Sequence, residues 1–338
     1  MSDAYQTDVV IIGAGPVGLF AVFECGMVGL SCHVVDSLDA IGGQCTALYP
    51  EKPIYDIPGY PKIQSADLIE QLEAQAAPFN PVYHLSQQVV AVEKPDGLWR
   101  VTTSKGTMLT AKAIIIAGGS GSFGPQKPPL DGLEAYEGSS VFYAVRSREQ
   151  FRGKHVVVAG GGDSAVDWAL SLTDVAARVS LVHRRDKFKA APAMVGKLHG
   201  LAAAGHLDLV VPYQLMSISG TGGCLESVTV SDLDGQQRTI QADVLLPFFG
   251  LSMTLGPIAD WGLDLDRSHI RVDQATAATS VSGIYAIGDI ATYPHKIKLI
   301  LTGFADAAQA AHAIYRQINP AQEFHFEYST TSGVPGGK

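Results

Sequence analysis

The chain alternates short, fully apolar runs with glycine-rich turns. Residues 9–12 carry four consecutive β-branched side chains, a pattern typical of a strand buried on both faces of a parallel sheet. A glycine-rich turn follows, after which the sequence predicts a helix over 17–28 and a second apolar strand over 33–35. This order predicts a strand–helix–strand unit near the start of the chain.

The next segment predicts a helix, a small antiparallel sheet and another buried strand. The helix spans 65–77, with Ser65 as its N-cap and apolar residues at helical spacing behind it. A proline-rich stretch over 120–132 marks a boundary between domains. The strands expected between these two features are a three-stranded meander over 89–92, 98–103 and 107–112, and a buried strand over 113–119.

A second unit of the same kind begins at residue 155. An apolar strand over 155–159 leads into three glycines and a helix, and a further strand is expected over 179–182. Residues 205–247 are again rich in strand signals, with a hairpin turn at Asp234. The remaining predicted elements are a crossing at 245–250, a strand over 279–289 that ends in Gly-Asp, and an alanine-rich helix over 303–316. The predicted fold class is therefore α/β, with two Rossmann-like dinucleotide-binding domains that each carry a small β-meander.

The first glycine turn has the spacing of a dinucleotide-binding site. Gly13 permits a tight turn, Gly15 lets the backbone approach a pyrophosphate, and Gly18 lets the following helix pack closely. The helix N-terminus then presents unpaired N–H groups to the phosphates. Asp36 ends the second strand, 23 residues after Gly13, where a carboxylate accepts hydrogen bonds from ribose hydroxyls.

The second glycine turn predicts a different nucleotide. The same offset of 23 residues from Gly160 leads to His183, Arg184 and Arg185, so a basic cluster stands where the first unit has an acid. An acid would repel a 2′-phosphate, whereas arginine pairs with it through charge-assisted hydrogen bonds. The first site therefore suits FAD or NAD and the second suits NADP(H). The expected NADPH contacts are Gly160, Gly162, Asp163, Ser164, His183, Arg184 and Arg185.

Composition narrows the class of partner and the compartment. The net charge of −9 argues against nucleic acid and anionic membranes as partners. No stretch is long and apolar enough for a transmembrane helix, and the first strand begins too early to leave room for a signal peptide. The four cysteines lack the spacing of a disulfide framework or a metal site, so we expect a reduced cytoplasmic setting and no metal.

The order of these motifs resembles the flavoprotein family with two dinucleotide-binding domains. In that family an FAD domain is interrupted by an NAD(P)H domain, and a Gly-Asp motif closes the FAD site. The resemblance implies an FAD domain over 1–118 and 249–338, including a C-terminal extension, and an NADP(H) domain over 119–248.

Two stretches narrow the resemblance to one branch of this family. The run from His183 to Ala190 is similar to that of thioredoxin reductases, with Lys189 at a further phosphate-binding position. The cysteine pair of that branch is missing, because residues 139–145 contain none. The loop over 49–59 and the tail over 324–332 instead resemble the thioredoxin-reductase-like ferredoxin–NADP⁺ reductases.

This resemblance implies a homodimer with a flavin covered on both faces. Tyr49 would stack on one face, and Tyr328 of the partner subunit's tail, with Ser329 and Thr330, would cover the other. The remaining FAD contacts implied by the family fall on Asp36, Gln44, Val89, Phe123 and Asp289.

The activity that the resemblance implies is hydride exchange between NADP(H) and N5 of FAD, followed by one-electron exchange with ferredoxin. No side-chain acid, base or nucleophile is required, so we assign no catalytic residue. Lys52, Lys296 and Lys298 are candidates for a basic patch that docks an acidic partner.

Three other functions agree with the same motifs. One is an NADPH-dependent reductase of another acceptor, such as a quinone. Another is an oxidase or peroxidase that uses the single Cys45, although a buried and inert thiol is the simpler interpretation of that residue. The third is a nucleotide sensor without enzymatic activity.

Overall fold

The computed structural model describes residues 5–119, 121–322 and 333–334. Contacts within the chain divide it into two compact units. The first unit comprises 1–123 and 253–338, and the second comprises 124–252. The chain passes between them in β11 (Ser122–Pro125) and β19 (Leu251–Thr254), which pair with each other. In the first unit, the chain therefore leaves the fold and returns to it.

A five-stranded parallel sheet forms the centre of the first unit, in the order β22-β10-β2-β3-β6. Its middle strands consist almost wholly of buried Val and Ile, because helices cover one face and a second sheet covers the other. The strands are β2 (Val9–Ile12), β3 (Cys32–Val35), β6 (Val82–His84), β10 (Ala113–Ile116) and β22 (Ile284–Ala286).

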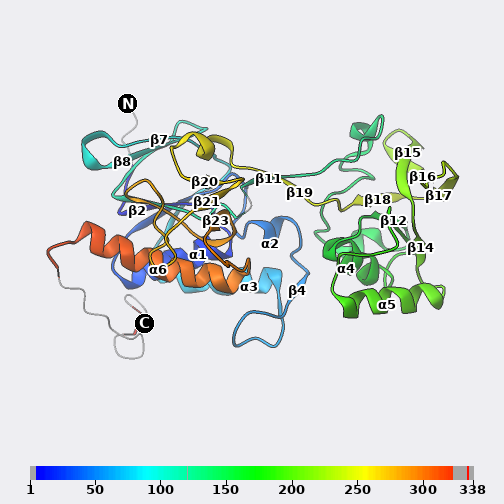
Figure 1. Cartoon of the computed structure of the whole chain (residues 1–338), viewed down its shortest axis with the longest axis horizontal. Helices are drawn as coiled ribbons and strands as arrows, with labels where there is room; N and C mark the ends of the chain where they lie inside the picture. Colours follow the sequence, from blue (N-terminus) through cyan, green and yellow to red (C-terminus); the bar gives the residue numbers. More distant parts are fainter. Residues whose placement is uncertain (1–4, 120, 323–332, 335–338) are drawn as a thin grey trace. The chain divides into compact units, whose positions relative to one another are not determined.

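Three helices cover one face of this sheet (Figure 1). They are α1 (Pro16–Met27), α3 (Ser65–Ala76) and α6 (Ile300–Ile318), and α1 packs between the other two. Alanines of α6 pack against α1, and a Cβ added to Gly303 would lie 2.4 Å from Val17 Cγ2. Helix α6 can therefore lie close to the start of α1 only because residue 303 has no side chain.

A four-stranded sheet covers the other face, in the order β1-β9-β8-β7. Trp99 and Val101 from this sheet pack against Ile114 and Ile116 of β10. The strands are β1 (Tyr5–Gln6), β7 (Val89–Glu93), β8 (Trp99–Thr103) and β9 (Met108–Ala111). Shorter elements of the unit are α2 (Gln44–Ala47), β4 (Pro53–Ile54), β5 (Ile63–Gln64), β20 (Leu265–Asp266), β21 (His269–Arg271) and β23 (Ala291–Thr292), with 3₁₀ turns at Ala77–Phe79, Pro95–Gly97, Gly256–Asp260 and Gly288–Ile290.

The second unit repeats this plan on a smaller scale. A parallel sheet in the order β14-β13-β12-β18 carries two helices, and a separate antiparallel sheet β15-β16-β17 packs against its core. The parallel strands are β12 (His155–Ala159), β13 (Arg178–Val182), β14 (Asp208–Val210) and β18 (Val244–Pro247). The other elements are α4 (Asp163–Leu172), α5 (Pro192–Ala203), β15 (Gln214–Thr221), β16 (Cys224–Ser231) and β17 (Gln237–Gln241), with 3₁₀ turns at Leu133–Tyr136 and Arg148–Phe151.

Several sequence-based expectations differ from this structure at the ends of helices. Ser65 is not an N-cap: Gln64 occupies that position, and Ser65 is the fully buried first residue of α3. Helix α6 begins at Ile300, three residues before the predicted start. The sequence pattern did not single out α5. In the described part of the chain, no helix is long and apolar enough to cross a membrane.

Candidate functional site

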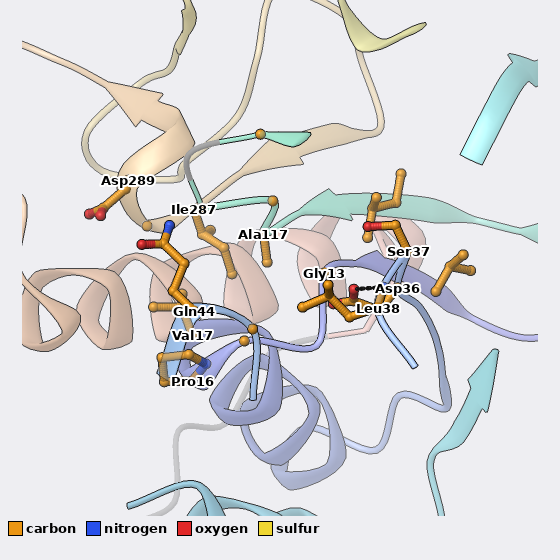
Figure 2. Close-up of a pocket in the computed structure, with 18 of the residues that line it drawn as sticks. Gly13, Pro16, Val17, Asp36, Ser37, Leu38, Gln44, Ala117, Ile287 and Asp289 are labelled. Atoms are coloured by element: carbon orange, nitrogen blue, oxygen red, sulfur yellow. Dashed lines mark hydrogen bonds between the residues drawn. The ribbon is translucent and has the colours of Figure 1, made fainter. Parts of the chain in front are cut away.

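A pocket of about 1160 Å³, including the part open to solvent, lies at the carboxyl ends of β2, β3, β10 and β22. In open α/β sheets, ligands bind at this edge. In Figure 2, Asp289 and Gln44 lie at one end of the pocket, Asp36 and Ser37 lie at the other, and Gly13 lies between them. The pocket is therefore elongated across the glycine turn.

The glycine turn brings bare backbone to the floor of this pocket. Gly13 has a φ of +113°, and a Cβ added there would lie 2.4 Å from the Ala117 carbonyl oxygen of the neighbouring strand. A Cβ on Gly15 would instead meet nothing within 4 Å, because this residue faces the open pocket. Gly15 is also the N-cap of α1, with no side chain capping the helix. The first N–H groups of α1 are thus available to an anion, as in pyrophosphate-binding turns.

Asp36 lies at one end of the pocket and is 9% exposed. Its two oxygens each accept one backbone hydrogen bond, Oδ2 from Ala14 N–H at 2.6 Å and Oδ1 from Leu38 N–H at 2.8 Å. Burial raises the pKa of this carboxyl, and the backbone donors partly oppose the increase. A carboxylate offers about four acceptor sites, so roughly two are left for the two hydroxyls of a ribose.

Gln44, Cys45, Tyr49 and Asp289 line the other end of the pocket. Burial raises the pKa of the Tyr49 hydroxyl, and the neighbouring Cys45 and Asp289 raise it further. Burial also raises the pKa of the Cys45 thiol, whose residue is 1% exposed. Tyr49 and Cys45 are therefore both uncharged at neutral pH. This end of the pocket suits a ligand that has an apolar ring system and a polar chain.

The pocket gathers most of the residues predicted for the first nucleotide. Gly18 lies beneath it, where an added Cβ would be 2.0 Å from the Gly13 carbonyl oxygen, so its role is helix packing. The side chain of Phe123, and the whole of Tyr328, Ser329 and Thr330, lie outside the described residues. The predicted residues that line the pocket are Gly13, Gly15, Asp36, Gln44, Tyr49, Val89 and Asp289.

Other lining residues were missed by sequence reasoning. Apart from Ile300 at the start of α6, they come from loops and turns without a motif, and only the fold brings them to this edge of the sheet. They are Ser37, Leu38, Gln87, Gln88, Leu255, Pro257, Ile258 and Ile300.

The second unit repeats the glycine turn with a basic loop beside it. Gly160 has a φ of +153°, and a Cβ there would lie 2.4 Å from the Phe248 carbonyl oxygen. Gly162 is the uncapped N-cap of α4, and an added Cβ would meet nothing within 4 Å. The N-terminus of α4, which begins with Asp163 and Ser164, therefore faces open space, as that of α1 does.

The basic loop is held against this turn by its backbone. Lys189 N–H donates to the Gly161 carbonyl at 2.7 Å, and Ala191 N–H donates to Asp163 Oδ1 at 3.0 Å. His183 is half-buried between Gly161 and Phe188, and burial lowers its pKa. Its ring therefore packs the loop against the turn. The other cations of the loop, Arg184, Arg185, Lys187 and Lys189, are all exposed.

The three lysines suggested for partner docking differ in availability. Lys296 is excluded as a docking residue, because its side chain is 3% exposed and forms an ion pair with Asp306. Lys52 is half-buried and has interactions of its own. Lys298 is exposed and lies within hydrogen-bonding distance of His269. In the described residues, no group of three His, Cys, Asp or Glu side chains is placed to hold a metal ion.

Comparison with known proteins places this chain in a family. The sequence profile of the pyridine nucleotide-disulphide oxidoreductases matches residues 7–313. The chain belongs to this family. It is therefore an oxidoreductase, and proteins of this kind depend on FAD and a pyridine nucleotide.

Close relatives carry a more specific name. A ferredoxin–NADP reductase of Rhodospirillum rubrum is 62% identical over 99% of this chain and 98% of the relative. Proteins of the same name from Paramagnetospirillum magneticum and Rickettsia canadensis are 60% and 55% identical, again over 98–99% of each chain. The family resemblance inferred from the motifs is thus confirmed.

Solved structures confirm the predicted fold class. The thioredoxin reductases of Lactococcus lactis and T. acidophilum each give a TM-score of 0.79 at 26% identity, over 93% of this chain and 99% of theirs. Residues 139–145, the stretch compared above with the cysteine pair of thioredoxin reductases, include Ser139 and Ser140. Both hydroxyls donate to the Gly223 carbonyl, so these two serines stabilise the turn between β15 and β16.

The pocket fits the adenosine and pyrophosphate of FAD, because a bare glycine turn, an uncapped helix N-terminus and a carboxylate with spare acceptor sites all line it. Replacing Asp36 with Asn should weaken FAD binding about tenfold or more, because hydrogen bonds to a charged group contribute about 1.5–3 kcal/mol each. The amide N–H₂ of the new side chain would also face either Ala14 N–H or Leu38 N–H, both of which are donors. Fluorescence of FAD released on dilution measures the change.

The matched control for this variant is Asp39→Asn, which makes the same change on the same loop outside the pocket lining. It should retain FAD as the wild type does. Equal FAD affinity in both variants and the wild type would contradict the assignment of Asp36 to the ribose.

Proposed function

We propose that this protein is an FAD-dependent ferredoxin–NADP⁺ reductase that exchanges electrons between NADP(H) and an iron–sulfur protein. The observation that carries the proposal is the pair of glycine turns, one beside the carboxylate of Asp36 and the other beside Arg184 and Arg185. The names of relatives at 55–62% identity over nearly the full chain support it.

In this proposal the first unit is the FAD domain. Asp36 receives the ribose hydroxyls, and the N-terminus of α1 receives the pyrophosphate. Gln44, Tyr49 and Asp289 orient the other end of the cofactor, with the Tyr49 ring against the flavin. When bound, FAD supplies the chemistry, since it can take a hydride from a nicotinamide and pass electrons on singly.

The second unit is the NADP(H) domain. The N-terminus of α4 receives the pyrophosphate, and the exposed cations Arg184, Arg185 and Lys189 receive the 2′-phosphate. Gly160, Gly162, Asp163 and Ser164 form the turn, and His183 holds the basic loop against it. The protein thus contributes binding and orientation rather than an acid, a base or a nucleophile.

We further propose a cytoplasmic homodimer that docks ferredoxin. Phe123, Tyr328, Ser329 and Thr330 are assigned to the flavin on the family resemblance alone. Lys298, the exposed one of the three suggested lysines, remains a candidate for an acidic partner. A cytoplasmic location agrees with the cysteines, which are all unpaired.

The experiment that tests the proposed function is anaerobic turnover with NADPH and purified [2Fe–2S] and [4Fe–4S] ferredoxins. We expect NADPH-dependent ferredoxin reduction, or NADP⁺ reduction by prereduced ferredoxin, at rates well above those with a quinone or a peroxide. Turnover with a quinone alone would identify a reductase of another acceptor, and no turnover with any acceptor would favour a nucleotide sensor.

Replacing Arg184 with Ala should weaken NADPH binding roughly tenfold or more, because one or more charge-assisted hydrogen bonds to the 2′-phosphate are lost. The KM for NADH should hardly change, since NADH lacks this phosphate. Lys154→Ala, a cation of the same unit outside the basic loop, is the control. Equal losses for NADPH and NADH would contradict the assignment.

Replacing Cys45 with Ser should leave turnover with ferredoxin within about twofold of the wild type. The thiolate is the reactive form of cysteine, and the raised pKa of this buried thiol keeps it protonated at neutral pH. The measurement is NADPH oxidation with ferredoxin and, separately, with peroxide. A peroxide-dependent rate that Cys45→Ser abolishes would instead support the single-cysteine oxidase or peroxidase.

A further inference from the structure

A carboxylate from α6 gathers three donors from the segment that follows β22. Asp306 is 3% exposed. It accepts hydrogen bonds from Gly288 N–H at 2.9 Å, from the Tyr293 hydroxyl at 3.2 Å and from Lys296 Nζ at 2.5 Å. One side chain therefore holds both ends of a nine-residue segment, Gly288 and Lys296.

Lys296 is the cation that makes this arrangement possible. Its side chain is 3% exposed, as little as that of its partner, and its Nζ lies 4.7 Å from the centre of the Tyr293 ring. A buried carboxylate without a counter-ion would be strongly unfavourable, and the ion pair removes the net charge. Neither residue lines the pocket, so neither is accounted for by contact with a ligand.

The segment that Asp306 holds does line the pocket. Gly288 and Asp289 line one end of it, and Ile300 at the start of α6 also lines the pocket. Gly288 has a φ of +72°, and an added Cβ would touch the Val17 side chain at 3.4 Å. The turn is thus confined between α1 on one side and the Asp306 carboxylate of α6 on the other.

We propose that the Asp306–Lys296 pair positions the Gly288–Ile290 turn, and through it the Asp289 carboxylate, against the flavin end of FAD. This inference rests on the proposed function only in taking FAD as the ligand. Apolar side chains of similar size are often as stable as a buried ion pair. An apolar pair would, however, offer no acceptor to Gly288 N–H. The essential property is therefore the oxygen that fixes the Gly288 backbone.

Two double variants of the full-length holoenzyme separate this role from general packing. Lys296→Met with Asp306→Asn removes both charges but keeps a carbonyl oxygen for Gly288 N–H. Lys296→Met with Asp306→Leu removes both charges and the acceptor. The two proteins differ only in one polar group at residue 306, and neither contains an unpaired buried charge. FAD release on dilution, the visible spectrum of the bound flavin and the thermal unfolding midpoint are measured for each.

We expect the Asn-containing variant to retain FAD within about threefold of the wild type and to keep its spectrum. The Leu-containing variant should bind FAD about tenfold more weakly and show a shifted flavin spectrum, because a buried N–H group loses its acceptor. Equal FAD affinity and identical spectra in both variants and the wild type, whatever their unfolding midpoints, would overturn the proposal.

A third variant keeps the test decisive if either double variant fails to fold. Tyr293→Phe removes one hydroxyl donor to Asp306 and changes no charge. Because Gly288 N–H keeps its acceptor, this variant should retain FAD within about threefold of the wild type and keep the flavin spectrum, whereas a tenfold loss of FAD would overturn the proposal. Wild-type protein that holds FAD but does not turn over ferredoxin would overturn the proposed function and leave this inference standing.

Discussion

The structure depends on one close approach of backbone to backbone, repeated in each unit. Gly13 lies against the Ala117 carbonyl of the adjacent strand, and Gly160 lies against the Phe248 carbonyl in the same way. Both glycines have a positive φ and leave no space for a Cβ. Because the chain can turn there without a side chain, the next helix begins at the edge of the sheet and directs its N-terminus toward a bound phosphate. A larger residue would move the helix and close the site.

The chemical difference between the units arises one strand later. After the second strand of the first unit comes Asp36, whose two carboxylate oxygens accept hydrogen bonds from backbone N–H groups. After the second strand of the second unit comes an exposed pair of arginines. The buried carboxylate is suited to hydroxyl groups, whereas the exposed guanidinium groups are suited to a phosphate. One backbone plan therefore serves two nucleotides, and the choice between them depends on a few side chains at equivalent positions.

The parts of this fold with strong local patterns were predictable from the sequence. The strand ending at Ile12 is a continuous β-branched run, and the strands ending at Val35 and Ala159 are rich in valine. The glycine spacing identifies the turns after the first and third of these strands. Other features depend on tertiary packing. Ser65 has the composition of an N-cap, yet it is buried as the first residue of α3 because the preceding strand pairs up to Gln64. Leu255 and Ile258 line the pocket although their loop has no periodic pattern.

The ion pair between Asp306 and Lys296 illustrates the same limit. In the sequence, Asp306 is a charged residue within an alanine-rich helix, and Lys296 has the local pattern of a surface cation available to a partner. Only the fold shows that the two side chains meet in the interior, beside the turn that carries Asp289. The two charges are ten residues apart and lie on different elements, so their pairing leaves no signal in local periodicity.

Anaerobic stopped-flow mixing of the FAD-loaded enzyme with NADPH, and separately with NADH, tests the central claim most directly. The claim is that one chain binds FAD in its first unit and recognises the 2′-phosphate of NADPH in its second unit. The account predicts rapid loss of oxidised-flavin absorbance at low concentrations of NADPH, loss at much higher concentrations of NADH, and recovery of the absorbance on addition of oxidised ferredoxin. Flavin absorbance that neither nucleotide changes, or the same concentration dependence for both, would contradict it.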